Sequence, residues 1–129
     1  MIVLDSSAAV EYLALRDLGV WVDDRIQEDP DVHTPHLFDV EVANGLRGLV
    51  HRGELRASDA RAALGDLADL DLARYPHVDL LERIWELRSH VSSYDAAYVA
   101  LAEVLDATLV TTDGRLARAH GHRARIVSP

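Results

Sequence analysis

Short apolar runs alternate along the chain with longer segments in which apolar residues return every three or four positions. The short runs predict β-strands at 2–5, 31–35, 71–76, 108–113 and 125–127. The longer segments predict helices at 7–15, 19–27, 36–51, 79–88 and 92–107, one that begins near 58, and a short one that ends near 120. Strands that alternate with helices in this way are typical of an α/β domain with a mainly parallel sheet.

The helical segments differ in how they distribute their apolar residues. Segment 92–107 is apolar or small on nearly every side, which predicts a buried helix. Helix 36–51 has an apolar stripe made of Phe38, Val42, Leu46, Leu49 and Val50. For helix 79–88 the pattern predicts one side made of Leu81, Ile84, Trp85 and Arg88. Ser58 has the side chain of an N-cap for the helix that begins there.

The length of the chain and its even spacing of elements predict one domain over residues 1–129. No linker, internal repeat or low-complexity segment interrupts the pattern. No apolar run approaches the length that a membrane span needs, and the first residues lack the pattern of a secretory signal. We therefore expect a soluble, cytoplasmic protein with no membrane contact.

The composition excludes several classes of function. All 13 basic residues are arginine, so a P-loop or any other lysine-dependent mechanism is excluded. The chain has no cysteine, which excludes thiol catalysis and cysteine-bound zinc. Its net charge of −9 argues against general electrostatic binding of nucleic acid. If the protein handles a polyanion, cations or a basic partner must supply positive charge locally.

Two acidic residues, Asp5 and Asp113, stand at the ends of predicted strands. The carboxyl ends of parallel strands meet at one edge of a sheet, so we expect both side chains to face one crevice. Glu41 borders the apolar stripe of helix 36–51, and Asp95 lies in the first turn of the buried helix. The sequence therefore predicts that four distant carboxylates converge.

Each of these acids also has a purely structural interpretation. Asp95 and Asp113 have positions suited to helix capping, and Glu41 alone fits a solvated helix residue. Asp5 resists such an interpretation, because a carboxylate that ends an apolar strand is buried and needs a partner. Converging carboxylates raise one another's pKa or recruit cations, and oxygen-only ligands suit Mg²⁺ or Mn²⁺. We infer a metal site.

With these acids in place, the sequence resembles the PIN-domain ribonucleases, and in particular the VapC-type toxins of toxin–antitoxin pairs. The resemblance spans essentially the whole chain and is carried by the motifs "IVLDSSA", "DVEVANGLRGL", "LRSHVSSYDAAYVALAE" and "LVTTDGRLARA". It implies a three-layer α/β/α PIN-like domain with a five-stranded sheet and an RNA endonuclease that depends on Mg²⁺ or Mn²⁺. A homodimer and inhibition by a cognate VapB-type antitoxin are implied as well.

The resemblance also assigns roles to residues. It maps the family's acidic tetrad onto Asp5, Glu41, Asp95 and Asp113, as catalytic residues and metal ligands. It gives supporting roles to the hydroxyl groups of two further residues, Ser6 and Thr111. Arg115 stands where some PIN nucleases carry a further acid, which removes one ligand of a second metal ion.

The mechanism that we expect is attack of metal-activated water on the phosphodiester, which leaves a 3′-hydroxyl and a 5′-phosphate. Asp5, Asp95 and Asp113 would hold the ion. Glu41 would hold it through water or orient the attacking water. The candidate RNA-binding residues are Arg47, Arg88 and Arg115, because guanidinium groups suit phosphate.

Other classes of function fit the sequence less well. A haloacid-dehalogenase-type phosphatase needs a second acid where Ser7 stands, and both it and a receiver domain need a lysine. The pairs His33/His36 and His120/His122 lack the HExxH spacing of a zinc site. The main alternative is a non-catalytic PIN-like interaction module. Loss of Mg²⁺ or Mn²⁺ binding on Asp5→Asn would distinguish the nuclease from it.

Overall fold

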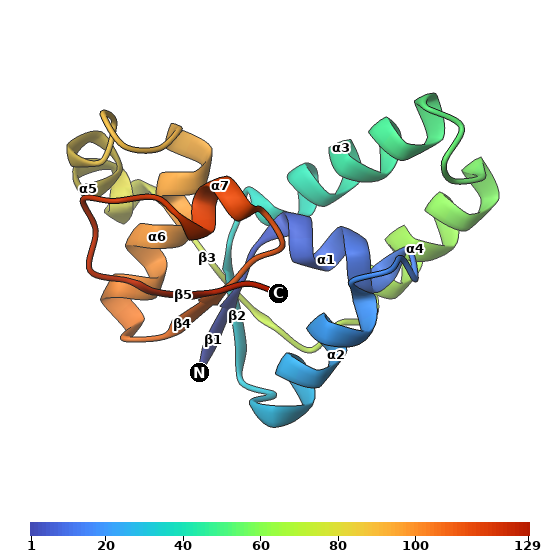
Figure 1. Ribbon diagram of the computed structural model, residues 1–129, viewed down its shortest axis with the longest axis horizontal. Coiled ribbons are helices and arrows are strands. Elements are labelled where there is room, and N and C mark those ends of the chain that lie inside the picture. The colour runs from blue at the N-terminus through green and yellow to red at the C-terminus, as the bar shows by residue number, and fades with distance from the viewer.

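The computed structural model describes all residues, 1–129, and contains one sheet of five parallel strands. The strands are β1 (Ile2–Leu4), β2 (Val32–Pro35), β3 (Ala73–Tyr75), β4 (Thr108–Val110) and β5 (Arg125–Val127). Helices α1 to α4 lie on one side of the sheet and α5 to α7 on the other (Figure 1). The predicted α/β/α class and five-stranded sheet are confirmed, and the sheet is parallel throughout.

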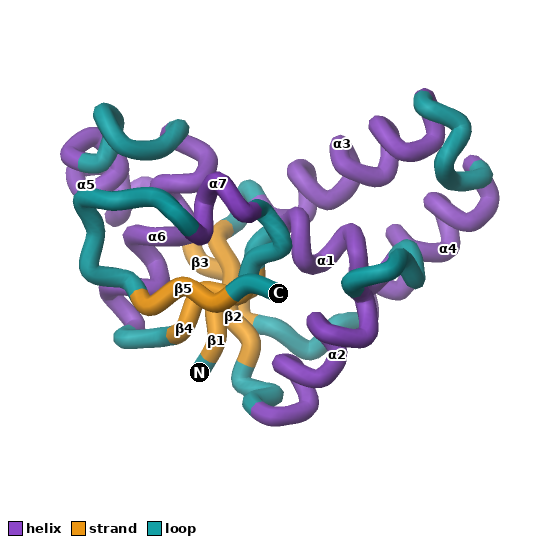
Figure 2. Tube along the Cα trace, viewed as in Figure 1, coloured by secondary structure: helices purple, strands orange, loops and turns teal.

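The strand order is β3-β2-β1-β4-β5, so β1 is the central strand (Figure 2). Ile2 pairs with Val32 on one side and with Thr108 on the other. The chain extends the sheet from β1 toward β3 first and then returns to add β4 on the opposite side. The change of direction falls between β1 and β4, and open parallel sheets hold their sites at such a point.

Four helices cover the first side of the sheet. They are α1 (Ser6–Leu13), α2 (Gly19–Glu28), α3 (Phe38–His51) and α4 (Ala57–Asp69). The apolar stripe of α3 is buried as predicted, except that Val50 is only partly covered. The prediction that Ser58 caps α4 is wrong: the helix already begins at Ala57, and Arg56 occupies the capping position without a side-chain hydrogen bond.

The other side is covered by α5 (Leu81–Glu86), α6 (Ser93–Leu105) and α7 (Gly114–Ala117), with a 3₁₀ turn at Val78–Leu80 before α5. Every residue of α6 from Ala96 to Ala102 is buried, which confirms the buried helix. Of the residues predicted to share one side of helix 79–88, Ile84 is buried, whereas Leu81 and Trp85 are exposed. The buried residues Leu80, Ile84 and Leu87 are spaced by four and three positions, so they form the inner side of this segment.

The core is one cluster of 28 buried apolar residues that includes both faces of β1. Val3 and Leu4 are fully buried, although their side chains point to opposite faces of the sheet. This burial on both faces explains why β1 reads as an unbroken apolar run. No helix has both the length and the apolar character that crossing a membrane requires.

Candidate active site at the carboxyl edge of the sheet

Asp5 directly follows β1 and is 4% exposed. Its backbone N–H still donates to Val110 of β4, so the residue is held at the end of the ladder. Its Oδ2 accepts hydrogen bonds from Ser7 Oγ at 2.5 Å and from Thr111 Oγ1 at 2.7 Å. Burial raises the pKa of Asp5, and the two hydroxyl groups oppose that rise.

The hydroxyl groups of Ser7 and Thr111 connect the ends of β1 and β4. They lie 3.2 Å apart, and each also accepts a backbone N–H: Ser7 Oγ that of Thr112, and Thr111 Oγ1 that of Asp113. The loop after β4 is therefore attached to the buried carboxylate. The supporting role of Thr111 was predicted. That of Ser7 was missed, although an Asp-x-Ser spacing at a strand end brings both side chains onto the first turn of α1.

Glu41 projects from the first turn of α3 and is half-buried. Its Oε1 accepts a hydrogen bond from the hydroxyl of Tyr98 at 2.6 Å. Burial raises the pKa of Glu41, the charges of Asp5 and Asp95 raise it further, and the Tyr98 hydroxyl opposes the rise. Tyr98 was not among the residues predicted to act at the site. Its position three residues after Asp95 places it on the same side of α6, and this spacing could have identified it.

Asp95 and Asp113 both lie at helix starts, but only Asp113 caps its helix with its own side chain. Ser92 caps α6 by accepting the Asp95 N–H at 3.1 Å. Burial raises the pKa of the Asp95 carboxyl, and the charges of Asp5 and Asp113 add to the rise. Asp113 caps α7 by accepting the Arg115 N–H at 2.8 Å. It follows β4 by three residues rather than directly, because the strand ends at Val110.

The four acids belong to the same edge of the sheet and influence one another electrostatically. Their convergence is looser than predicted, because no three His, Asp or Glu side chains lie close enough together to hold a metal ion as they stand. The chemistry of the residues nevertheless fits a hard divalent cation. Every donor is an oxygen, and none of Asp5, Glu41 and Asp95 forms an ion pair with an arginine or histidine.

A cleft of about 660 Å³ opens beside these residues. It is lined by Ser6, Ser7, Val10, Glu11, Arg16, Glu41, Asn44, Gly45, Leu49, Arg52, Thr112, Asp113 and Arg115. Ser6, a predicted supporting residue, thus lies on the cleft wall together with Glu41. The buried Asp5 carboxylate lies behind that wall, held by Ser7.

Of the three arginines predicted to bind RNA, only Arg115 lines this cleft. Arg47 lies on the other side of α3, in an apolar groove shared with α4. Arg88 is engaged with Trp85: its guanidinium lies 4.8 Å from the ring centre and donates to the Trp85 carbonyl. Arg16 and Arg52, which the sequence did not single out, line the cleft instead.

The family model for the PIN domain matches residues 2–121. Ribonuclease VapC9 of Mycobacterium tuberculosis is 48% identical over 116 residues, which covers 90% of this chain and 88% of that protein. The solved structure of M. tuberculosis VapC20, described as a Sarcin-Ricin loop cleaving toxin, aligns over 100% of both chains with a TM-score of 0.68 and 22% identity. VapBC2 from Rickettsia felis, solved bound to a promoter DNA fragment, aligns over 99% of this chain and 98% of that chain with a TM-score of 0.69 and 14% identity.

Proposed function

The chain belongs to the PIN-domain family, and on this premise we propose that it is an Mg²⁺- or Mn²⁺-dependent endoribonuclease toxin that a cognate antitoxin neutralises. The observation that carries the proposal is its high identity to a VapC ribonuclease over most of the chain. The carboxylates of Asp5, Glu41 and Asp95 support it chemically, since none of them forms an ion pair with an arginine or histidine. Residues 1–129 would act as one PIN-like nuclease domain.

Asp5, Asp95 and Asp113 would hold the divalent cation, with Glu41 holding it through water or orienting the attacking water. When bound, the cation supplies the positive charge that polarises the phosphate and activates water, which this acidic chain cannot supply itself. Ser7 and Thr111 keep the Asp5 carboxylate in place by donating to Oδ2. Attack of water in line with the leaving 3′-oxygen gives a 3′-hydroxyl and a 5′-phosphate and does not use the RNA 2′-hydroxyl.

The proposed partners follow from the same chemistry. The carboxylates of Asp5, Glu41 and Asp95, which have no cationic partner in the protein, suit an arginine-bearing segment of a VapB-type antitoxin, which would compete with the cation. The likeness to VapBC2 of Rickettsia felis supports such a pairing. We further propose a homodimer, as the family resemblance implies, and action in the cytoplasm, where its RNA substrate would be found.

The test is cleavage of RNA by the purified protein with Mg²⁺, with Mn²⁺ and with EDTA, followed by analysis of the product ends. We expect cation-dependent cleavage, 5′-phosphate ends, and at least about a hundredfold loss of activity in Asp5→Asn. Cyclic phosphate ends would contradict attack by water. If neither the wild type nor any added cation supports cleavage, and Asp5→Asn leaves cation binding unchanged, the protein is a non-catalytic PIN-like module.

A further inference from the structure

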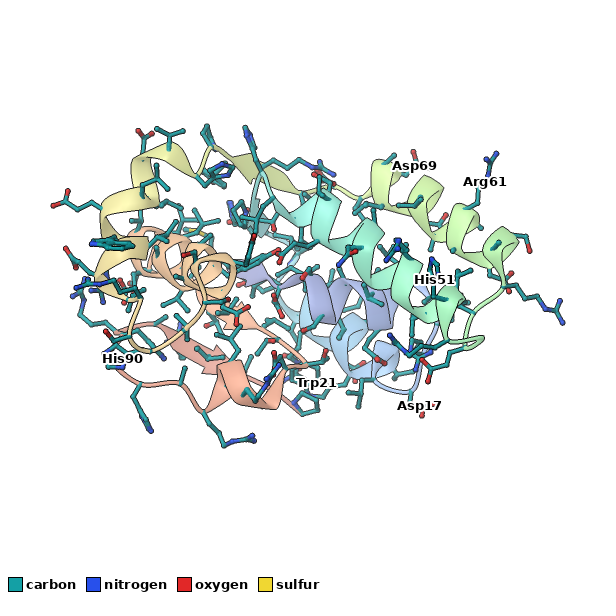
Figure 3. The ribbon with its side chains drawn as sticks, turned by 90° about the horizontal axis from the view of Figure 1, so that it is seen from above. Asp17, Trp21, His51, Arg61, Asp69 and His90 are labelled. Carbon is teal, nitrogen blue, oxygen red and sulfur yellow. The ribbon has the colours of Figure 1, made fainter.

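The cleft continues well beyond the acidic residues. Helices α1 and α3 leave the carboxyl edge of the sheet together and run outward side by side (Figure 1). Their close approach depends on Gly45, since a Cβ there would lie 2.8 Å from Val10 of α1. Asp17, just after α1, and His51, the last residue of α3, mark the outer ends of the two helices at the same end of the molecule (Figure 3).

One face of α3 forms the floor of this outer part of the cleft. Asn44, Gly45 and Gly48 follow Glu41 by three, four and seven residues, so they continue its side of the helix. The rise of an α-helix places Gly48 roughly 10 Å beyond Glu41 along the axis. Asn44, Gly45 and Leu49 of this helix line the cleft, and Gly48 lies beneath the Arg52 guanidinium at its outer end.

Arg52 and Arg16 occupy the outer end of the cleft. The Arg52 guanidinium folds back over Gly48, where a Cβ would lie 3.0 Å from Nη1. Its only carboxylate partner is Glu54, at 2.9 Å, and its side chain is 63% exposed. Arg16 lies 3.4 Å from Glu11 on the opposite wall. The Arg52–Glu54 pair is exposed and contributes little free energy, so a phosphate can replace Glu54 at small cost. The Arg16–Glu11 pair is less exposed, so Arg16 is the weaker contributor of the two.

Charges of both signs line the cleft, in different proportions at its two ends. The inner end carries Glu41 and Asp113, with Arg115 beside Asp113, and these carboxylates repel a phosphate unless a cation intervenes. The outer end carries the two guanidinium groups of Arg16 and Arg52, each paired with one carboxylate. We infer that the α1–α3 cleft is the track of the RNA strand, in which Arg52 and Arg16 bind a backbone phosphate beyond the cleavage point. This inference rests on the proposed ribonuclease function and adds where its substrate lies.

Arg52→Gln tests the inference, with Arg47→Gln as its matched control, because Arg47 lies on the same helix but faces the groove toward α4. Binding of a fluorescein-labelled single-stranded RNA pool of random sequence is measured by anisotropy at several salt concentrations. We expect Arg52→Gln to weaken binding about tenfold and to reduce the salt slope of the binding constant by about 0.7, the value for one lost phosphate contact. Arg47→Gln should change neither quantity.

A second variant distinguishes the effect of where the Arg52 guanidinium lies from the effect of its charge. Gly48→Leu keeps every arginine but fills the floor on which the Arg52 guanidinium lies, and it replaces glycine by a better helix former, so the helix should not be weakened. We expect weaker RNA binding than in the wild type. In cleavage assays both variants should raise KM while kcat stays near that of the wild type, because the contact is remote from the reacting phosphate.

The inference is overturned if Arg52→Gln binds RNA like the wild type, or if Arg47→Gln loses as much affinity. It is also overturned if polyglutamate binds as tightly as RNA with the same dependence on Arg52, which would make the cleft a site for acidic peptides. A wild type that binds RNA through Arg52 without cleaving it would refute the ribonuclease proposal and leave the RNA track supported. A wild type that neither binds nor cleaves RNA would refute both.

Discussion

The hydroxyl of Tyr98 donates a 2.6 Å hydrogen bond to Oε1 of Glu41, and so joins the buried helix α6 to the acidic end of α3. Tyr98 is fully buried and Glu41 is half-buried, so the bond ties a core side chain to one that borders the cleft. It fixes one oxygen of the carboxylate.

Tyr98→Phe should therefore lower activity without disrupting the core, since the ring remains and only the hydroxyl is lost. We expect a decrease in kcat of about tenfold, the usual effect of removing a group that orients an active-site ligand. Tyr94→Phe on the same helix is the control, because Tyr94 is 67% exposed. Steady-state kinetics of both variants make the comparison, and equal kcat values would show that Tyr98 does not position Glu41.

Thr111→Val should destabilise the protein by about 1–3 kcal/mol, because it removes a hydroxyl that donates to the buried Asp5 and accepts the Asp113 N–H. The substitution keeps the shape of the side chain, so the loss reports the two hydrogen bonds. Thr112→Val changes the neighbouring hydroxyl as a control. Urea unfolding of the three proteins measures the difference, and an equal loss in both variants would assign no special role to Thr111.

Asp95→Asn should abolish cleavage while leaving the cation-free protein at least as stable as the wild type at neutral pH. The pKa of Asp95 is raised above its ordinary value of 3.8 by burial and by the charges of Asp5 and Asp113. A carboxyl with a raised pKa in the folded state contributes stability below its unfolded pKa, and this stability is lost as the pH rises through the folded pKa. Asparagine has no carboxyl group to ionise, so the stability of the variant does not fall in this way as the pH rises.

The check is the free energy of unfolding of both proteins in EDTA, measured at a series of pH values from about 3.8 upward. The free energy of unfolding of the variant should increase relative to that of the wild type as the pH rises. Added Mg²⁺ or Mn²⁺ should then stabilise the wild type more than the variant. A clear fall in the Tm of the variant at neutral pH would instead indicate that Asp95 mainly serves the start of α6.

Glu103→Gln should cost about 3 kcal/mol of stability, because Glu103 is the 5% exposed partner of Arg83 in an ion pair that joins α6 to α5. Burial opposes its ionisation, but the Arg83 guanidinium and the Arg123 N–H outweigh burial and hold its pKa below 4.5. This stability should therefore be present above pH 4.5 and lost as the pH falls through the lowered pKa.

Glu86→Gln is the control for that prediction, since Glu86 binds the same arginine but is 55% exposed. We expect it to cost less than about 1 kcal/mol. Thermal unfolding at neutral and acidic pH compares the two variants. A loss in Glu103→Gln that does not shrink at acidic pH would contradict the assignment to this ion pair.

Asp113 was predicted at the end of its strand but follows β4 by three residues. The arrangement of strands and helices, and the strand-end position of Asp5, could be read from the sequence. Both depend on local periodicity and on the rule that parallel strands end at one edge of the sheet. The side of helix 79–88 predicted from Leu81, Ile84, Trp85 and Arg88 differs from the side that is buried, which consists of Leu80, Ile84 and Leu87. Periodicity finds a helix more reliably than it finds the helix's orientation.

The sequence by itself determined the fold class, the family and the acidic residues, since these follow from spacing along the chain. Only the tertiary structure decided that Tyr98 holds Glu41, that Ser7 and Thr111 hold Asp5, and that Arg52 rather than Arg47 faces the cleft. Each of these relationships joins or separates side chains according to how two elements pack. Residues far apart in sequence meet only after the helices have docked on the sheet, so no local pattern records their contact.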